Sequence, residues 1–390
     1  MMHDQPFLFI VFLIFTGAAL VATLFLYLRQ ALLVAYILLG MALGPFGLAL
    51  VTDPVLISRL SDIGIVFLLF LLGLNLPIPK LLQLVRETTL VTGLSALVFG
   101  LIGVIVARGF GFTLTEQLVT GAAMMFSSTI IGLKLLPTTI LHHQHTGQII
   151  ISILLLQDLL AIGVLLLIQL LGGAGLSGWH MLGVVLGLPL LFGLGYVAER
   201  YVLVRLIRRY DTIQEYIFLM AIGWCVGFAQ LAASLGLSYE IGAFLAGVAL
   251  ATSPIALYIA ESLKPLRDFF LVMFFFSLGA GFDLGSLPQV LAPALVLAGA
   301  SLLVKPWLFH LLLVRSGEDP GCATEVGVRL AQISEFSLLI SVLALNRGLI
   351  GHDASYVIQT ATILTFLVSS YYTVLRYPTP IAVSDRLRRD

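Results

Sequence analysis

Apolar residues occur in long runs along this chain, and short polar segments separate one run from the next. A helix needs about 20 apolar residues to cross a bilayer, and these runs reach that length repeatedly. Backbone polar groups inside a bilayer must be satisfied within the protein, so runs of this kind predict helices. We predict thirteen spans, at about 7–27, 31–49, 55–75, 88–109, 115–136, 147–171, 179–204, 213–235, 238–254, 268–284, 288–313, 323–346 and 354–376.

Composition supports an all-α membrane protein. Of the 390 residues, 60% are hydrophobic and 10% are charged, whereas a soluble domain has about 25% charged residues. The first apolar run lacks a basic leader segment, so we interpret it as a span rather than a signal peptide. Cys225 lies in a span and Cys322 in a short predicted loop, which predicts no disulfide framework. The net charge of zero argues against a nucleic-acid partner.

Lysine and arginine residues are distributed unevenly between the two sides of the predicted bundle. Fourteen fall in loops on one side, and only Arg59, Arg108 and Arg347 fall on the other. Cytoplasmic loops carry the excess of positive charge. We therefore place the N-terminus outside and the C-terminus in the cytoplasm, and we expect the cell (inner) membrane as the location.

Two pairs of spans resemble each other at the level of residue pattern. The stretch 35–44 is similar to 242–251, and 67–76 is similar to 274–283. Each pair is seven spans apart, and an odd offset reverses direction through the membrane. Inverted repeats of this kind are typical of secondary transporters, which bind their substrate near the bilayer midplane. Chance similarity among segments rich in glycine, leucine and phenylalanine is the alternative.

One carboxylate stands in the middle of a predicted span. Asp158, with Gln157 beside it, lies within the apolar stretch 154–162. An ionisable side chain at membrane depth costs roughly 2.5–3.5 kcal/mol on insertion scales, and such groups usually serve a function. The alternative is a structural aspartate that caps or pairs with a neighbouring helix.

Polar clusters also interrupt the fifth and twelfth predicted spans. Ser127, Ser128 and Thr129 are consecutive, and their hydroxyls cannot share one face of a regular helix. The twelfth span carries a second cluster at 332–337, which includes Ser334. Interrupted helices in matching positions indicate a transporter site. Bonding of the hydroxyls to the preceding helical turn is the alternative for the triplet.

Three charged residues near these clusters need partners. Glu335 could accept hydrogen bonds from backbone N–H groups at a helix break, or pair with Lys305 or Arg329. We favour a structural role for Glu335. Lys305 could extend to the cytoplasmic side along its aliphatic stem, or compete with the transported cation for a site carboxylate.

A histidine cluster falls in the predicted turn after the fifth span. His142, His143 and His145 lie close together in sequence, without cysteine or acidic residues nearby in the sequence. We interpret the segment as an interfacial loop rather than a metal site. A pH-sensing role is the alternative, because histidine titrates near neutrality.

The most specific stretch of the chain runs from Ser127-Ser128-Thr129 through 134–136 to Gln157-Asp158. Together with 242–247, 40–45 and 334–336, it resembles the cation:proton antiporter-2 family, and most closely its Kef-type potassium efflux branch. The resemblance covers nearly the whole chain. It implies a sodium/proton antiporter-like fold with two broken, crossing helices, and a homodimer built mainly on the first and eighth spans.

The resemblance also implies a domain organisation. We expect a transmembrane antiporter domain at 1–378, with a mobile core drawn in part from 31–171 and 238–376. The short segment 379–390 would be a cytoplasmic tail, without the nucleotide-binding regulatory domain that Kef-type proteins usually carry. Family members commonly have glutamate where this chain has Asn75, which leaves the regulatory role of that span open. No Gly-rich phosphate loop follows a strand, so we expect no bound nucleotide or other cofactor.

These features lead to a mechanistic hypothesis. Asp158 would alternately bind a proton and a monovalent cation, K⁺ or Na⁺, with K⁺ favoured. Gln157 would orient Asp158 or help to coordinate the ion, and the hydroxyls of the triplet at 127–129 would replace its water. A single acid beside a neutral amide predicts electroneutral exchange, because the empty charged site should cross the membrane poorly. Lys305, Glu335, Ser334 and Arg329 would support the core.

Other classes of protein fit the sequence less well. A gated potassium channel would need a carbonyl filter such as Thr-Val-Gly-Tyr-Gly, which is absent from the sequence. An intramembrane protease would need two neighbouring aspartates or a His-Glu-x-x-His helix, and neither motif occurs. We therefore do not expect an enzyme. A sensor that kept the fold and lost transport is harder to exclude by sequence.

Overall fold

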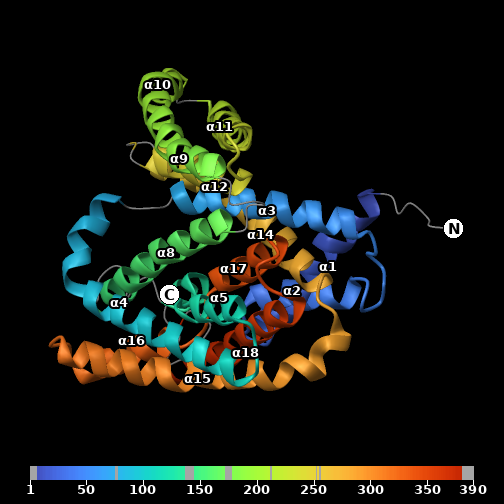
Figure 1. Cartoon of the computed structure of the whole chain (residues 1–390), viewed down its shortest axis with the longest axis vertical. Coiled ribbons are helices and arrows are strands. Elements are labelled where there is room, and N and C mark those ends of the chain that lie inside the picture. Colours follow the sequence, from blue (N-terminus) through green and yellow to red (C-terminus); the bar gives the residue numbers. More distant parts are fainter. Residues whose placement is uncertain are drawn as a thin grey trace.

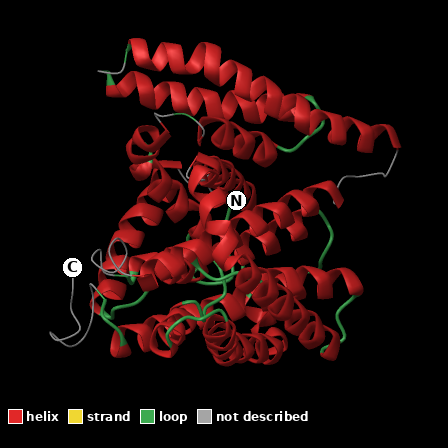
Figure 2. Ribbon diagram, turned by 90° about the vertical axis from the view of Figure 1, so that its left-hand side faces the viewer, coloured by secondary structure: helices red, strands yellow, loops and turns green. Residues whose placement is uncertain are grey.

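The computed structural model describes residues 7–74, 78–136, 145–171, 178–210, 213–251, 253 and 256–379. Helices make up the fold in these ranges and pack in layers (Figure 1, Figure 2), in agreement with the predicted all-α class. Helices α9, α10 and α11 stand together at one end of the molecule (Figure 1). Asn75, His142 and His143 lie outside the described residues.

Seven helices in the described part of the chain are long and apolar enough to cross a membrane. The protein is therefore a multi-pass membrane protein. These helices are α1 (Phe7–Tyr27), α3 (Pro54–Leu74), α4 (Ile78–Gly109), α8 (His145–Leu171), α11 (Gln214–Ser234), α15 (Leu287–Arg315) and α18 (His352–Arg376).

The other helices are shorter or joined in series. They are α2 (Leu32–Leu43), α5 (Leu114–Met124), α6 (Thr129–Lys134), α9 (Gly178–Ala198), the π-helix η1 (Glu199–Leu203), α10 (Val204–Arg209), α12 (Tyr239–Ala251), α13 (Ala256–Ser262), α14 (Lys264–Ala280), the 3-10 turn η2 (Leu284–Ser286), α16 (Pro320–Arg329) and α17 (Glu335–Asn346).

Several helix ends differ from the predicted spans for local reasons. Helix α2 ends at Leu43 rather than near 49, because Pro45 disfavours the helical conformation for Gly44, which is extended (ψ 179°). Helix α4 begins at Ile78 rather than near 88, because its polar first turns continue the helix beyond the apolar run. Cys322 lies in the first turn of α16 and not in a loop, which corrects that prediction.

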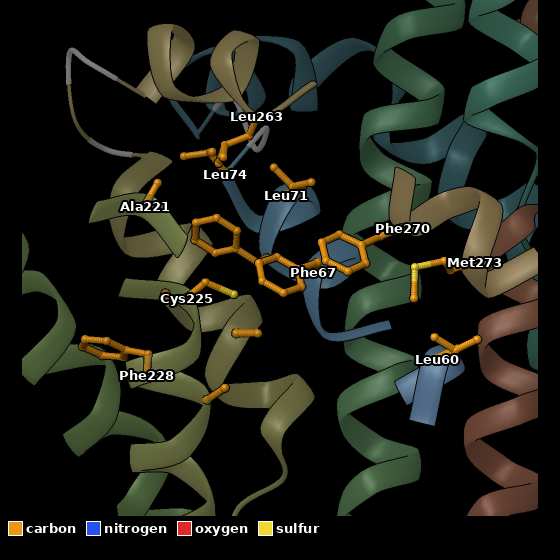
Figure 3. Close-up of a cluster of buried hydrophobic side chains, with 14 of the residues drawn as sticks. Leu60, Phe67, Leu71, Leu74, Ala221, Cys225, Phe228, Leu263, Phe270 and Met273 are labelled. Atoms are coloured by element: carbon orange, nitrogen blue, oxygen red, sulfur yellow. The ribbon is translucent and has the colours of Figure 1, made fainter. Parts of the chain in front are cut away.

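Buried hydrophobic side chains join α3, α11 and α14 into one cluster (Figure 3). The rings of Phe67 and Phe270 stack with centroids 4.3 Å apart. Cys225 is buried in this cluster and is not part of a disulfide. A second cluster brings side chains from α5, α6, α8, α17 and α18 together, and it surrounds the polar region described next.

Candidate ion-binding site

Two helices break in the middle of the protein, at the positions where polar clusters interrupt the apolar pattern. Helices α5 and α6 are separated by the non-helical residues 125–128, and α16 and α17 by 330–334. Each break is capped by its own serine. The Ser128 hydroxyl accepts a hydrogen bond from the Ile131 N–H (3.1 Å), and the Ser334 hydroxyl accepts one from the Phe336 N–H (3.1 Å). The interruption predicted from the hydroxyl triplet is therefore present.

The two breaks contact each other across about 200 residues of sequence. The Ser127 hydroxyl donates to the Leu330 carbonyl (2.8 Å), and Gln332 Nε2 donates to the Ser128 carbonyl (3.4 Å). Ser127 and Ser128 are fully buried. Backbone groups freed by the breaks thus find partners in the opposite break, as groups withdrawn from water must.

Helix α8 brings Gln157 and Asp158 to this junction. Gln157 is fully buried and its Oε1 accepts from the Ser127 N–H (2.9 Å). Asp158 is 8% exposed, and its Oδ1 accepts from the Thr129 hydroxyl (2.9 Å). The structure therefore gathers Asp158, Gln157 and the hydroxyl triplet in one place, as the sequence predicts.

Glu335 also reaches this junction from the start of α17. Its Oε1 accepts a hydrogen bond from the Ile130 N–H (3.1 Å), a backbone donor freed by the break before α6. This is the first of the two roles considered for Glu335. Pairing with Lys305 or Arg329 is not found among the ion pairs of the described residues, so that alternative is wrong.

Lys305 is fully buried in α15, which excludes the first of the two roles considered for it, extension to the cytoplasmic side. Its Nζ donates to the Phe126 carbonyl (2.6 Å) and to the Gln332 carbonyl (3.2 Å), one from each break. The ammonium group satisfies carbonyls that no helical N–H can reach. Pro306 follows Lys305 but does not end the helix.

Arg329 lies at the end of α16 and is turned away from Asp158. It contacts the Glu325 carboxylate (2.8 Å) and the carbonyls of Leu135 and Pro378 (3.0 Å each). Its role in this structure is to join α16 to the segment after α6 and to the segment after α18. It makes no ion pair with Asp158 or Glu335.

Several supporting residues were not identified from the sequence. The Thr365 hydroxyl accepts from the Ile333 N–H (3.1 Å), the Ser369 hydroxyl donates to Gln332 Oε1 (2.9 Å), and the Ser301 hydroxyl donates to the Ala331 carbonyl (2.8 Å). A signal was available for α18, because Thr362, Thr365 and Ser369 recur at helical spacing within an apolar run.

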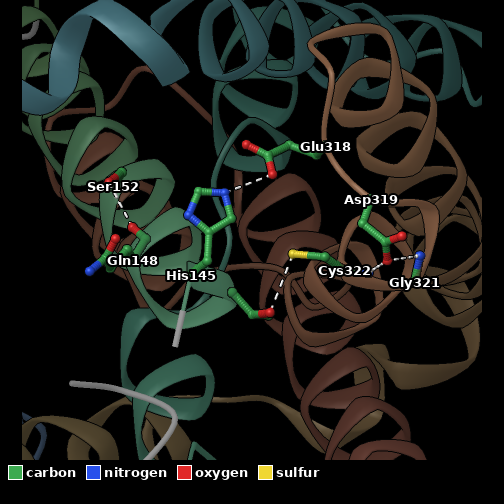
Figure 4. Close-up of polar contacts among 8 residues, drawn as sticks. His145, Gln148, Ser152, Glu318, Asp319, Gly321 and Cys322 are labelled. Atoms are coloured by element: carbon green, nitrogen blue, oxygen red, sulfur yellow. Dashed lines mark hydrogen bonds and ion pairs between the residues drawn. The ribbon is translucent and has the colours of Figure 1, made fainter. Parts of the chain in front are cut away.

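His145 pairs with an acidic residue that is distant in sequence. Its Nε2 lies 2.8 Å from Glu318 Oε2, and the neighbouring Thr146 contacts Cys322 (3.3 Å), as Figure 4 shows. His145 is also the first residue of α8 rather than part of the predicted loop, which corrects that prediction. The described residues contain no group of three or more histidine, cysteine or acidic side chains that could hold a metal.

The chain is similar in sequence to a known protein family and to several named relatives. The profile of the family described as "Sodium/hydrogen exchanger, transmembrane" matches residues 11–374. The chain is 31% identical to K(+) efflux antiporter 4 of Arabidopsis thaliana and to the putative K(+) efflux antiporter KefB of Alkalimonas amylolytica, covering 87% and 88% of this chain. It spans 59% and 52% of the length of these two relatives.

A third relative carries a different name. The iron transporter MagA of Paramagnetospirillum magneticum is 29% identical over 88% of this chain and 80% of its own length. Among solved structures, the sodium proton antiporter MjNhaP1 of Methanocaldococcus jannaschii matches with a TM-score of 0.62 and 18% identity. The match covers 95% of this chain and 96% of that one, which shows a shared fold.

The family match confirms the resemblance to Kef-type cation:proton antiporters and identifies a transporter rather than an enzyme. The chain belongs to the sodium/hydrogen exchanger transmembrane family of cation/proton antiporters.

Proposed function

We propose that this protein exchanges a monovalent cation, K⁺ in the first instance, for a proton across the cell (inner) membrane. The observation that carries the proposal is the position of Asp158. It is a buried carboxylate in a membrane-spanning helix, bonded by the Thr129 hydroxyl where two broken helices meet. The electrically neutral partner Gln157 stands beside it.

Charge balance explains why such a site would exchange ions rather than leak them. Asp158 with either a proton or one monovalent cation is neutral, whereas the empty carboxylate carries one negative charge. Moving a bare charge through the low-dielectric core is costly, so only loaded sites change sides. Exchange is then obligatory, and one proton moves for each cation without net charge transfer.

The contacts support a division of roles among the site residues. Asp158 and Thr129 present oxygen atoms at the junction, and oxygen ligands suit an alkali cation. The backbone at the breaks is held in place by hydrogen bonds with the side chains of Gln157, Ser127 and Ser128. Ser334 caps α17, while Lys305 and Arg329 satisfy carbonyls.

The choice of K⁺ over Na⁺ rests on the names of the potassium efflux relatives. Na⁺/H⁺ exchange is the alternative within the same fold, because the family description and the structural neighbour refer to sodium. Cavity geometry rather than residue type decides between these two ions.

The wider architecture is part of the same proposal. We infer thirteen spans in inverted repeats, with the N-terminus outside, and a transmembrane antiporter domain over 1–378 with a tail at 379–390. The proposal includes a homodimer through α1 and α11; the span in α1 is less buried within the chain than the other six described spans, which supports a partner at α1. The mobile core would include both breaks.

Proteoliposomes containing the purified protein test the proposal. Addition of K⁺, Na⁺, Rb⁺ or Li⁺ should release internal protons, measured with a pH-sensitive dye, and Asp158→Asn should abolish the signal. Asp268→Asn is the matched control, because Asp268 lies at the surface beside Arg267. This variant should exchange ions as the wild type does. A potential-sensitive dye should report no charge movement during exchange.

Three results would contradict the proposal. Exchange retained by Asp158→Asn would remove this carboxylate from the mechanism. Current without proton coupling would indicate a channel. Absence of any cation-coupled proton movement in the wild-type protein would favour a sensor that has lost transport.

A further inference from the structure

Glu335 holds the break before α6 with only one of its two carboxylate oxygens. Oε1 accepts from the Ile130 N–H, as described above, and the side chain as a whole is buried, at 8% exposure. A purely structural cap needs a single acceptor at this position. The second oxygen, Oε2, is therefore the atom to explain.

Oε2 is inaccessible to solvent and makes no hydrogen bond to any described residue. Ser128 and Thr129 lie against the same carboxylate. The Thr129 hydroxyl donates to Asp158, and the Ser128 hydroxyl, which accepts from the Ile131 N–H, makes no hydrogen bond to Oε2. A buried carboxylate oxygen without a partner is unfavourable. Gln157 Nε2, also at the junction, is a second buried polar atom without a partner among the described residues. Unsatisfied atoms of this kind point to a ligand.

The carboxylates of Asp158 and Glu335 are bonded by two consecutive residues at the start of α6, Asp158 by the Thr129 hydroxyl and Glu335 by the Ile130 N–H. Both approach the same residue, since Thr129 bonds Asp158 through its hydroxyl and lies against Glu335 through its backbone. Among the side chains that the structure describes, no lysine, arginine or histidine lies within 4.0 Å of either acid. Two adjacent buried carboxylates favour a cation between them.

We propose, on the basis of the function proposed above, that Glu335 is a second ligand of the transported cation. Its Oε1 is fixed by Ile130, and its Oε2 is free to coordinate the ion together with Asp158 and the Thr129 hydroxyl. This goes beyond the structural role expected for Glu335 from the sequence.

The charges of the described core are compatible with this role. Lys305 and Glu335 carry opposite charges in the same buried region, and Arg329 is paired with Glu325. These four fixed charges cancel. With these four side chains in their ionised forms, a second carboxylate ligand does not alter the one-to-one exchange, and Asp158 is the group that takes up the proton.

Glu335→Gln separates the structural role from the binding role. Glutamine keeps an oxygen for the Ile130 N–H and has the same length, but it replaces the free carboxylate oxygen by an amide and removes the charge. In proteoliposomes we expect the K⁺ concentration for half-maximal proton release to rise at least tenfold. Glu318→Gln is the matched control, because Glu318 pairs with His145 away from the junction, and its half-maximal concentration should equal that of the wild type.

Exchange by Glu335→Gln with a half-maximal K⁺ concentration within twofold of the wild type would overturn the proposal. In that case Asp158→Asn would still abolish exchange, and the proposed antiport would stand. Failure of the wild-type protein to exchange would instead refute the antiport itself. The two failures are therefore distinguishable.

A measurement on the wild-type sequence covers the case in which Glu335→Gln does not fold. Infrared difference spectra recorded on replacing choline by K⁺ should contain a carboxylate band that shifts when the protein is labelled with ¹³C-glutamate. Such a band reports a glutamate that contacts the ion. If every K⁺-dependent carboxylate band is insensitive to glutamate labelling, Glu335 is not a ligand.

Discussion

Helices α2 and α14 pack so closely that one added methyl group should force them apart. A Cβ at Gly40 would lie 2.0 Å from the Phe276 carbonyl oxygen, and a Cβ at Gly279 would lie 1.9 Å from the Ile37 carbonyl oxygen. Both obstacles are backbone atoms, which cannot turn away as a side chain can. Gly40→Ala is therefore a direct test of this contact.

The same arrangement recurs between α3 and α12. A Cβ at Gly247 would lie 2.1 Å from the Phe70 carbonyl oxygen, and one at Gly73 would lie 2.4 Å from the Phe244 carbonyl oxygen. Gly247 occupies the position in 242–251 that Gly40 occupies in 35–44. If the two halves are inverted repeats, Gly247→Ala should have a cost similar to that of Gly40→Ala.

The size of the effect follows from the distances. A carbon and a carbonyl oxygen approach to about 3.3 Å at closest, so the helices must separate by roughly 1.3 Å near Gly40. Overpacking of this kind costs about 1–3 kcal/mol, and separation also removes dispersion contacts along the interface. We expect a loss of about 3 kcal/mol, a large share of a stability of about 5–15 kcal/mol.

Thermal unfolding of the detergent-purified variants measures this loss. Gly299→Ala in α15 is the control, because nothing lies within 4 Å of a Cβ at that position. It should leave the Tm unchanged or raise it slightly, since alanine favours a helix by about 0.5–1 kcal/mol. A Tm for Gly40→Ala equal to that of Gly299→Ala would refute the packing argument, and a Gly247→Ala variant of normal stability would refute its repetition.

Two further predictions concern single contacts. Thr365→Val should lower the free energy of unfolding by about 1–3 kcal/mol, because it leaves the Ile333 N–H without an acceptor. Thr360→Val in the same helix should be neutral, since the Thr360 hydroxyl has no partner among the described residues. Equal Tm values for the two variants would contradict this prediction. Glu318→Gln should change the free energy of unfolding by less than about 1 kcal/mol. The imidazole of His145 is 64% exposed, and solvent screens the interaction of such an exposed pair. A Tm for this variant that falls by several degrees would contradict the prediction.

The apolar pattern was sufficient to predict the long helices and the break before Thr129. Runs of about 20 apolar residues have few folded alternatives in a bilayer, and three consecutive hydroxyls do not suit one helical face. The pattern was poorer at helix ends, because polar turns of α4 extend the helix and Pro45 shortens α2. These effects are local, but they act outside the hydrophobic periodicity.

Partners across the fold could not be predicted from the sequence. Lys305 bonds a carbonyl 179 positions away, and Glu335 bonds an N–H 205 positions away. Both acceptor and donor are backbone groups, so no residue type at 126 or 130 signals the contact. The sequence therefore left two roles open for Glu335 and two for Lys305, and neither of the two for Lys305 was the bonding of carbonyls that the structure shows.

The two broken helices separate charge in a way that explains why Lys305 does not neutralise Asp158. The breaks that follow the negative ends of α5 and α16 present free carbonyls, and Lys305 bonds one carbonyl from each break. The starts of α6 and α17 present free N–H groups, and acidic or hydroxyl oxygens from Glu335, Ser128 and Ser334 lie there. Lys305 is thus bonded by backbone carbonyls on its own side of the junction, and Asp158 is left to bind a mobile ion.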